Sequence, residues 1–178
     1  MIKMYVGIVG SRRFKDVEFI ERLMEGIVKR FGGGVVFVSG DCGSGVDRFV
    51  GEVCRLRSWN LVRCCVNRRL YGVYGNRLYY WRNLRIVKMC DVVYCVVERG
   101  YCGKGSKMVF ELCKRYGVKV VWLEVDDDGK VVRVDGDVDC KEYKNGFCLV
   151  LGEKCKYVWW NCKLRKICEE IRKESEVK

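Results

Sequence analysis

The sequence of 178 residues contains no alanine, threonine, proline, histidine or glutamine. Every codon for these five amino acids has cytosine in its first or second position, whereas every residue type present can be encoded without cytosine. We therefore infer a coding strand almost free of cytosine, a skew more plausible for a virus or another mobile element than for a cellular gene. The same skew favours cysteine codons, so the 13 cysteines fit mutational bias as well as chemistry.

Metal-binding motifs are missing as well. The cysteines form no Cys-x-x-Cys pair, and without histidine no mixed zinc site can be completed. The sequence therefore predicts no metal site and gives no indication of a bound cofactor. It leaves open whether cysteines form disulfide bonds within or between chains.

Membrane and export signals are also lacking. No apolar run approaches the roughly 20 residues that span a bilayer, and the first six residues lead into a strand-like pattern rather than a signal peptide. A hydrophobic fraction of 49% argues against a disordered chain. We expect a folded cytoplasmic protein, located in the cytoplasm of the host cell if the gene is viral.

Acidic residues are absent between Val53 and Cys90, in a chain whose formal net charge is +12. The basic residues near and within this segment are Arg55, Arg57, Arg63, Arg68, Arg69, Arg77, Arg82, Arg85 and Lys88. The aromatic residues among them are Trp59, Tyr71, Tyr74, Tyr79, Tyr80 and Trp81. This mixture suits phosphate capture combined with base stacking. The alternative is a basic face that only aids solubility.

Short apolar runs alternate with amphipathic patterns over residues 1–125. Strands are predicted at 4–9, 35–38, 60–66, 91–97 and 118–125, and helices at 17–31, 45–57, 76–89 and 105–116. Asp16 is a plausible N-cap for the first helix, and Gly32 ends it. The pattern predicts an α/β fold, Rossmann-like, with a doubly wound and mostly parallel sheet covered on both faces.

The pattern changes after residue 125. Strands are predicted at 130–134, 147–151 and 156–160, followed by a helix at 161–176. We interpret residues 1–125 as a nucleotide-binding domain and residues 126–178 as a β-hairpin extension with a C-terminal helix. The extension is expected either to pack on the main sheet or to form an oligomer contact.

Three glycine-bearing loops follow the first, second and fourth predicted strands. Their residues are Gly10, Ser11 and Arg12, then Ser39, Gly40, Asp41, Gly43, Ser44 and Gly45, then Gly103, Gly105 and Ser106. Because the carboxyl ends of parallel strands share one edge, these loops are expected to form a crevice at the topological switch point. Two of them open helices, whose free N–H groups favour anions.

The motifs that carry these loops resemble the SLOG superfamily, which joins the DNA-processing protein DprA and the Lonely Guy enzymes on a Rossmann-like fold. The matching segments, from residue 1 to about 125, are VGIVGSR at 6–12, VSG at 38–40, GVDR at 45–48, RN at 82–83, DVV at 91–93 and GKGS at 103–106. The YspA-like branch is the most similar. The resemblance implies binding of a nucleotide or nucleotide-derived ligand, in some members as a sensor in defence against mobile elements.

The resemblance also implies roles for individual residues. Ser11 and Arg12 would contact phosphate or ribose, the glycines and Ser44 of the second loop would line the crevice, and Gly103, Gly105 and Ser106 would hold a phosphate. Arg82 would act as a charged clamp. Asn83 is either a ligand contact or a structural hydrogen bonder. Asp47 and Arg48 either contact ligand or form an ion pair that holds the start of the helix.

Two departures from the family pattern bear on activity. Asp41 stands where the branch has a second glycine, which places a carboxylate near the expected anion site. Val109 stands where the Lonely Guy enzymes have the glutamate that is needed to cleave the base from a nucleotide. Glu111 lies two residues further on, about 200° around the helix, and should face elsewhere.

Three functions follow from these observations. The leading hypothesis is a nucleotide-binding protein that acts as a sensor or sequesters its ligand. The second is a hydrolase of a nucleotide N-glycosidic bond, with Asp41, Asp91, Glu98 or Glu111 as acid or base. The third is binding of single-stranded nucleic acid in the manner of DprA. A homodimer is the default expectation, because homo-oligomers are common among related folds.

Overall fold

A six-stranded sheet forms the centre of the protein. The computed structural model describes residues 3–101, 103–136, 143–144, 147–148 and 153–154. The strand order is β3-β2-β1-β4-β5-β6. The strands are β1 (Met4–Gly10), β2 (Val35–Gly40), β3 (Asn60–Cys64), β4 (Val92–Glu98), β5 (Lys119–Val125) and β6 (Val131–Gly136). The first five strands in this order are parallel to their neighbours, and β6 is antiparallel to β5. This confirms the predicted Rossmann-like, doubly wound α/β fold.

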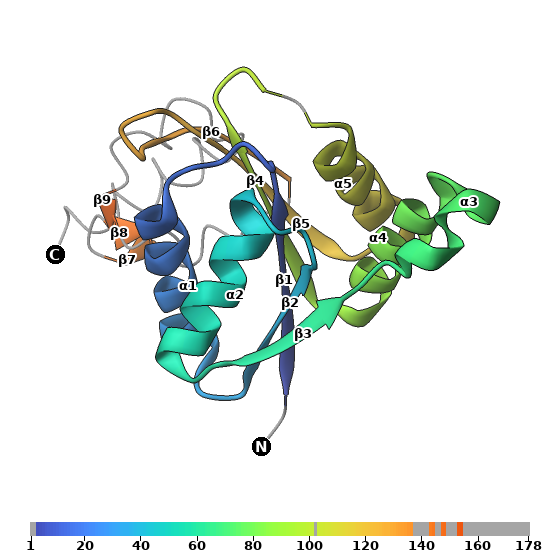
Figure 1. Ribbon diagram of the computed structural model, residues 1–178. Coiled ribbons are helices and arrows are strands. Elements are labelled where there is room, and N and C mark those ends of the chain that lie inside the picture. Colours follow the sequence, from blue (N-terminus) through green and yellow to red (C-terminus); the bar gives the residue numbers. More distant parts are fainter. Residues whose placement is uncertain (1–2, 102, 137–142, 145–146, 149–152, 155–178) are drawn as a thin grey trace, which may run out of the picture.

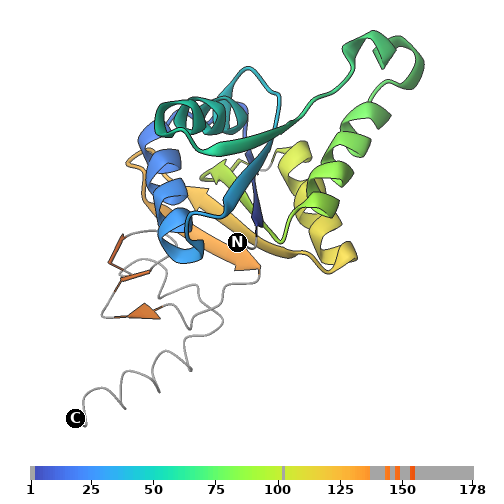
Figure 2. The same cartoon turned by 90° about the horizontal axis from the view of Figure 1, so that it is seen from below.

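Helices cover both faces of this sheet (Figures 1 and 2). One face carries α1 (Val17–Phe31) and α2 (Gly45–Arg57), and the other carries α4 (Arg77–Met89) and α5 (Lys104–Tyr116). Because both faces are covered, the central strands are apolar throughout, and every residue of β2 is buried. A hydrophobic core lies on each face of the sheet, and successive side chains of β4 point alternately into one core and the other. Val96 packs on the side of α1, and Val97 packs on the side of α5.

The local signals of α1 predict both of its ends correctly. The Asp16 carboxylate accepts a hydrogen bond from Phe19 N at 2.8 Å, as an N-cap does. Gly32 has a φ of 81°, and its N–H donates to Val28 O. Local backbone chemistry thus determines where this helix begins and stops.

The long loop predicted before α4 contains two short elements, η1 (Arg68–Leu70) and α3 (Tyr71–Tyr74). The Asn67 side chain accepts a hydrogen bond from Arg69 N at 3.2 Å. This local turn starts η1. Neither η1 nor α3 contains a buried residue, so their sequence shows no helical periodicity of apolar residues. The pattern of hydrophobic residues could therefore not reveal them.

Beyond residue 125, β6 extends the main sheet. Asp126 Oδ1 accepts hydrogen bonds from Asp128 N and Lys130 N, which closes the turn into the antiparallel strand. A second sheet pairs β7 (Tyr143–Lys144), β8 (Phe147–Cys148) and β9 (Glu153–Lys154). The strand predicted at 156–160 and the helix at 161–176 lie outside the described residues, and the domain boundary at 125 stays a prediction. Across the described part of the chain, no helix has the length and apolar character required to cross a membrane.

Candidate ligand crevice

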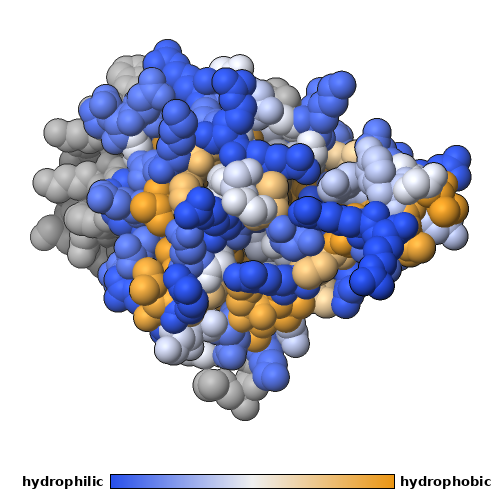
Figure 3. Space-filling model, in the orientation of Figure 1, coloured by the Kyte–Doolittle hydropathy of each residue, from blue (hydrophilic) through white to orange (hydrophobic). Residues whose placement is uncertain are grey.

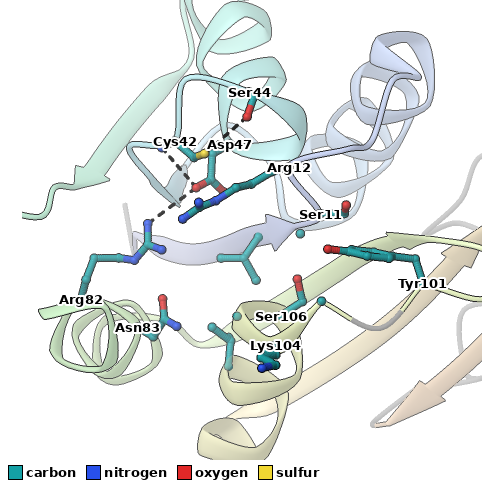
Figure 4. Close-up of a pocket in the computed structure, with 15 residues that line it drawn as sticks. Ser11, Arg12, Cys42, Ser44, Asp47, Arg82, Asn83, Tyr101, Lys104 and Ser106 are labelled. Carbon is teal, nitrogen blue, oxygen red and sulfur yellow. Dashed lines mark hydrogen bonds and ion pairs between the residues drawn. The ribbon is translucent and has the colours of Figure 1, made fainter. Parts of the chain in front are cut away.

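A cavity of about 520 Å³ opens at the carboxyl ends of β1 and β4 (Figure 4). These two strands are neighbours, and the chain winds outward from them in opposite directions, so the cavity lies at the topological switch point of the sheet. Its lining consists of Val9, Gly10, Ser11, Arg12, Cys42, Ser44, Asp47, Arg82, Asn83, Tyr101, Gly103, Lys104, Gly105, Ser106 and Val109.

The cavity brings together nine of the residues that the sequence points to, which are Gly10, Ser11, Arg12, Ser44, Arg82, Asn83, Gly103, Gly105 and Ser106. The part that each plays in binding stays a prediction. Ser39, Gly40, Asp41, Gly43 and Gly45 do not line it. Asp47, for which the sequence left ligand contact or an ion pair open, also lines the cavity. The lining residues that were not expected are Val9, Cys42, Tyr101, Lys104 and Val109. Val9, Cys42 and Lys104 lie beside candidate residues, and Tyr101 precedes Gly103 by two positions.

Gly40 makes room for an ion pair. A Cβ at this position would collide with Arg82 Nη1 and Asp47 Oδ2. Arg82 Nη1 lies 3.6 Å from Asp47 Oδ2 and 3.9 Å from Asp41 Oδ1. The absence of a side chain at Gly40 therefore lets a guanidinium from α4 reach the first turn of α2.

Asp47 is the acidic member of this cluster. Its carboxylate accepts a hydrogen bond from Cys42 N at 3.4 Å, and Ser39 Oγ lies 3.2 Å away. Burial raises the pKa of Asp47 above its ordinary value, and the charge of Arg82 opposes that rise. The ion pair of Asp47 is with Arg82, whereas Arg48 pairs with Glu52 at 2.8 Å. The start of α2 is thus held by α4.

The first turn of α2 also contacts the first loop. Val46 N donates to Ser11 O at 3.1 Å. Gly45 has a φ of +64°, and a Cβ there would meet Ser11 O and the backbone of Arg12. This close contact binds two of the three glycine loops to each other, and it takes up an N–H group at the helix terminus.

The first turn of α5 has no comparable partner within the described residues. Gly103 is the N-cap and makes no side-chain capping bond, and the turn contains no acidic residue. Lys107 N makes the first hydrogen bond of the helix, to Gly103 O, so the preceding N–H groups have no partner within it. Lys104, Gly105 and Ser106 all line the cavity. The positive end of the helix dipole therefore faces the crevice.

The side chains of the crevice add further positive charge. Three cations, Arg12, Arg82 and Lys104, line it together with one carboxylate, that of Asp47. Within the described residues, Arg12 and Lys104 form no ion pair, and Arg82 Nε is buried without a hydrogen-bond partner. Figure 4 shows Arg12 and Arg82 pointing toward each other near Asp47, with Tyr101 at the other end. The crevice is suited to an anion.

Asn83 and Val109 form part of the wall on the α4 and α5 side. Asn83 is buried, and its Nδ2 contacts Met108 Sδ at 3.5 Å, so it joins α4 to α5 as well as lining the cavity. Val109 is buried and lines the cavity; its correspondence to the glutamate of the Lonely Guy enzymes stays a prediction.

The carboxylates considered for catalysis are dispersed. Asp91 lies directly before β4, at the opposite edge of the sheet from the crevice, and its Oδ2 accepts a hydrogen bond from Tyr5 N at 2.8 Å. Glu98, Glu111 and Asp41 do not line the cavity. Asp47 is the one carboxylate that lines it in the described part of the chain. The crevice therefore offers no pair of carboxylates for acid–base chemistry there.

Fold and crevice together define a Rossmann-like α/β protein with a cationic site at its switch point. Its fold is similar to that of the molybdenum cofactor binding protein from the phototrophic bacterium Rippkaea orientalis, with a TM-score of 0.56 and 19% sequence identity. The similarity covers 71% of this chain and 79% of that protein. No protein-family model and no curated protein match the sequence. Membership of the SLOG superfamily and of its YspA-like branch stays a prediction.

Proposed function

We propose that the crevice binds a nucleotide or nucleotide-derived molecule through its phosphate, and that the protein acts as a sensor or sequesters that molecule. The observation that carries the proposal is the uncapped first turn of α5, which lines the same cavity as Arg12 and Lys104. Free N–H groups and guanidinium or ammonium groups without a carboxylate partner are suited to a phosphate.

The remaining parts of the crevice suit the rest of a nucleotide. A volume of about 520 Å³ lies in the range of small-molecule sites, roughly 300–1,000 Å³. Asp47 offers an acceptor for a ribose hydroxyl, and the ring of Tyr101 offers a stacking surface for a base. A cavity of this size favours a small molecule over a polynucleotide, which argues against a DprA-like role for the crevice itself.

Binding is favoured over catalysis by the distribution of the carboxylates. Hydrolysis of an N-glycosidic bond would depend on Asp47, the one lining carboxylate among the described residues. Release of free base from a nucleotide, lost in Asp47→Asn, would establish the hydrolase and replace the sensor. We expect no such release.

Thermal unfolding with a panel of ligands tests the proposal. The panel contains nucleoside mono- and diphosphates, NAD, ADP-ribose, cyclic dinucleotides and, because of the neighbour in fold, the molybdenum cofactor. A ligand at one hundred times its Kd adds about 2.7 kcal/mol, or about 5–10 °C for a chain of this length.

Single-site variants test whether the ligand-induced shift in melting temperature arises from binding in the crevice. Arg12→Ala and Lys104→Ala should lose most of this thermal shift. Lys107→Ala is the matched control, because it removes one exposed cation from the same helix outside the cavity, and it should keep the full shift. The proposal fails if no phosphate-bearing ligand stabilises the protein, or if Lys107→Ala reduces the shift as much as Lys104→Ala.

A further inference from the structure

Residues 65–81 form an arm that projects from the carboxyl edge of β3, and α3 lies at its tip, away from the sheet (Figures 1 and 2). The arm comprises η1, α3 and the first turn of α4. None of the residues in η1 or α3 is buried. The tip therefore contributes little to the core, and folding alone does not account for its composition.

Large apolar side chains are exposed on this arm. Val73 is 74% exposed and Trp81 is 47% exposed, and Leu70, Tyr71 and Tyr74 are exposed too. Three of the five large aromatic side chains exposed in the described residues belong to the arm. At the right of the molecule in Figure 3, where α3 lies in Figure 1, hydrophobic and hydrophilic residues stand side by side on the surface. Exposed apolar side chains that cluster in this way are typical of a binding surface.

The aromatic rings of the arm are held in fixed orientations. Tyr71 packs edge-to-face on Tyr79 with ring centroids 6.2 Å apart, and Tyr74 packs in the same way on Trp81 at 5.3 Å. The Tyr71 hydroxyl donates to Asn76 Oδ1 at 3.2 Å. These contacts hold the rings in place before a partner arrives, which lowers the entropic cost of stacking against them.

The charge on the arm has one sign. Arg68, Arg69 and Arg77 are exposed, and none of them forms an ion pair within the described residues. No acidic residue occurs between Val53 and Cys90. Two such arms would repel each other, so a second copy of the chain is disfavoured as the partner. The surface favours a partner that combines negative charge with flat apolar groups.

The arm is also connected to the crevice. The guanidinium of Arg12, which lines the cavity, lies 5.8 Å from the ring centroid of Tyr79, and Tyr79 packs against Tyr71. Cations and rings therefore follow one another from the crevice to α3.

We propose that the arm binds a single-stranded polynucleotide, with bases stacked on Tyr71, Tyr74 and Trp81 and phosphates on Arg68, Arg69 and Arg77. Unpaired bases present the flat faces that exposed rings take up, whereas the bases of a duplex are stacked on one another. Arginine, rather than lysine, fits phosphate with its fork and also stacks on bases. The stacking and phosphate-binding residues of the arm do not line the crevice, so a strand bound there does not occupy the site of the proposed nucleotide.

Fluorescence anisotropy with labelled 20-nucleotide single strands of mixed sequence, as DNA and as RNA, tests the proposal. A 20-base-pair duplex of the same sequence and anionic phospholipid vesicles serve as competitors. The arm variant is Arg69→Ala with Tyr71→Ala. The matched control is Arg115→Ala with Tyr116→Ala, which removes one exposed arginine and one tyrosine of the same exposure, 45% against 46%, from the far end of α5.

We expect the wild type and the control to bind the single strand equally and the arm variant to bind at least tenfold more weakly, since each stacked base contributes substantially. The affinity of the arm variant for the single strand should also fall less steeply with salt concentration than that of the wild type. Arg77→Ala, alone, should weaken binding without removing a ring and serves as a second variant. Unchanged melting temperatures would show that all variants fold.

Four results would overturn the proposal. The first is an affinity for duplex equal to that for the single strand, and the second is an equal loss of affinity in the control. The third is displacement of the protein from the strand by anionic vesicles. The fourth is a dimer in light scattering that the arm variant abolishes. None of them bears on the crevice, which the thermal shift with small nucleotides examines separately.

Discussion

Helices α2 and α5 both begin at the rim of the crevice, and their first turns differ. In α2, Val46 N donates to Ser11 O, and the turn carries Asp47, which pairs with Arg82. Neither N-cap, Ser44 in α2 or Gly103 in α5, makes a side-chain capping bond, but the first turn of α5 holds no acidic residue. One N–H group and the carboxylate of the α2 turn thus have partners within the protein, whereas the described residues offer no such partner to the α5 turn, which lines the cavity.

This difference shows that similar sequence signals have two uses. Both helices follow a strand and a loop rich in glycine, which alone predicts two phosphate sites. In the loop before α2, Gly40 and Gly45 allow close contact between segments of the protein, because a side chain at either position would collide with its neighbours. At α5, a Cβ on Gly105 would meet open space. Gly40 and Gly45 therefore have a structural role, whereas Gly105 has no such contact, and the phosphate of the proposed ligand is expected at the α5 loop.

The largest expected effect comes from Gly45→Val. The backbone there has a φ of +64°, and any Cβ would collide with Ser11 O, so the free energy of unfolding should fall by about 3 kcal/mol or more. Gly43→Val is the control, because a Cβ there meets open space, and it should cost below about 1 kcal/mol. Urea denaturation measures both. Equal losses would contradict the structural role of Gly45.

Arg82→Ala should have the next largest effect. It leaves Asp47, whose side chain is 9% exposed, without its nearest cation, and we expect a cost of about 2 kcal/mol at pH 7. Loss of the cation should raise the pKa of Asp47 further, so the variant should lose stability as pH rises and the carboxyl group ionises. A cost that is the same at pH 4 and pH 7 would show that Arg82 does not stabilise the Asp47 charge. Arg82→Lys should recover part of the loss.

Gly105→Asp separates stability from binding at α5. A carboxylate in the first turn favours the helix dipole, so stability should stay equal or rise by below about 1 kcal/mol. The same charge should repel a phosphate and weaken the binding of the stabilising ligand by about tenfold, or about 1.4 kcal/mol. Gly105→Asn adds a similar volume without charge and should bind more tightly than Gly105→Asp. Equal binding by the two variants would place the phosphate elsewhere.

Asp47→Asn should give the smallest effect, with a distinctive pH dependence. Burial raises the pKa of Asp47 above its ordinary value of 3.8, so the stability contributed by the protonated form is present at low pH and is lost as pH rises through the raised pKa. The asparagine variant cannot ionise. It should therefore gain stability relative to the wild type between acid and neutral pH, and thermal unfolding across that range measures the trend. A trend of opposite sign would mean that Arg82 outweighs burial.

Much of the fold could be predicted because its signals are local. The ends of α1 follow from Asp16 and Gly32, and the buried strands follow from their apolar runs. The candidate site could be predicted in part, since loops after parallel strands meet at one edge. Gly40 and Gly45 were expected to line the crevice and instead permit contacts with Arg82 and Ser11, which depend on segments distant in sequence.

For the arm, the sequence showed the composition but not the exposure of its side chains. Its composition was visible in the sequence, as a segment with arginines and aromatic residues but no acid. A buried aromatic residue and an exposed one have the same letter, however, so exposure and the pairing of Tyr74 with Trp81 appear only in three dimensions.

The sequence by itself determined the alternation of strands and helices, the parallel sheet and the positions of three loops, because hydrophobic periodicity and helix caps act over a few residues. Only the tertiary structure decided which polar groups at the two helix termini find partners within the protein. The reason is that the partners of the α2 turn, Ser11 and Arg82, come from other elements.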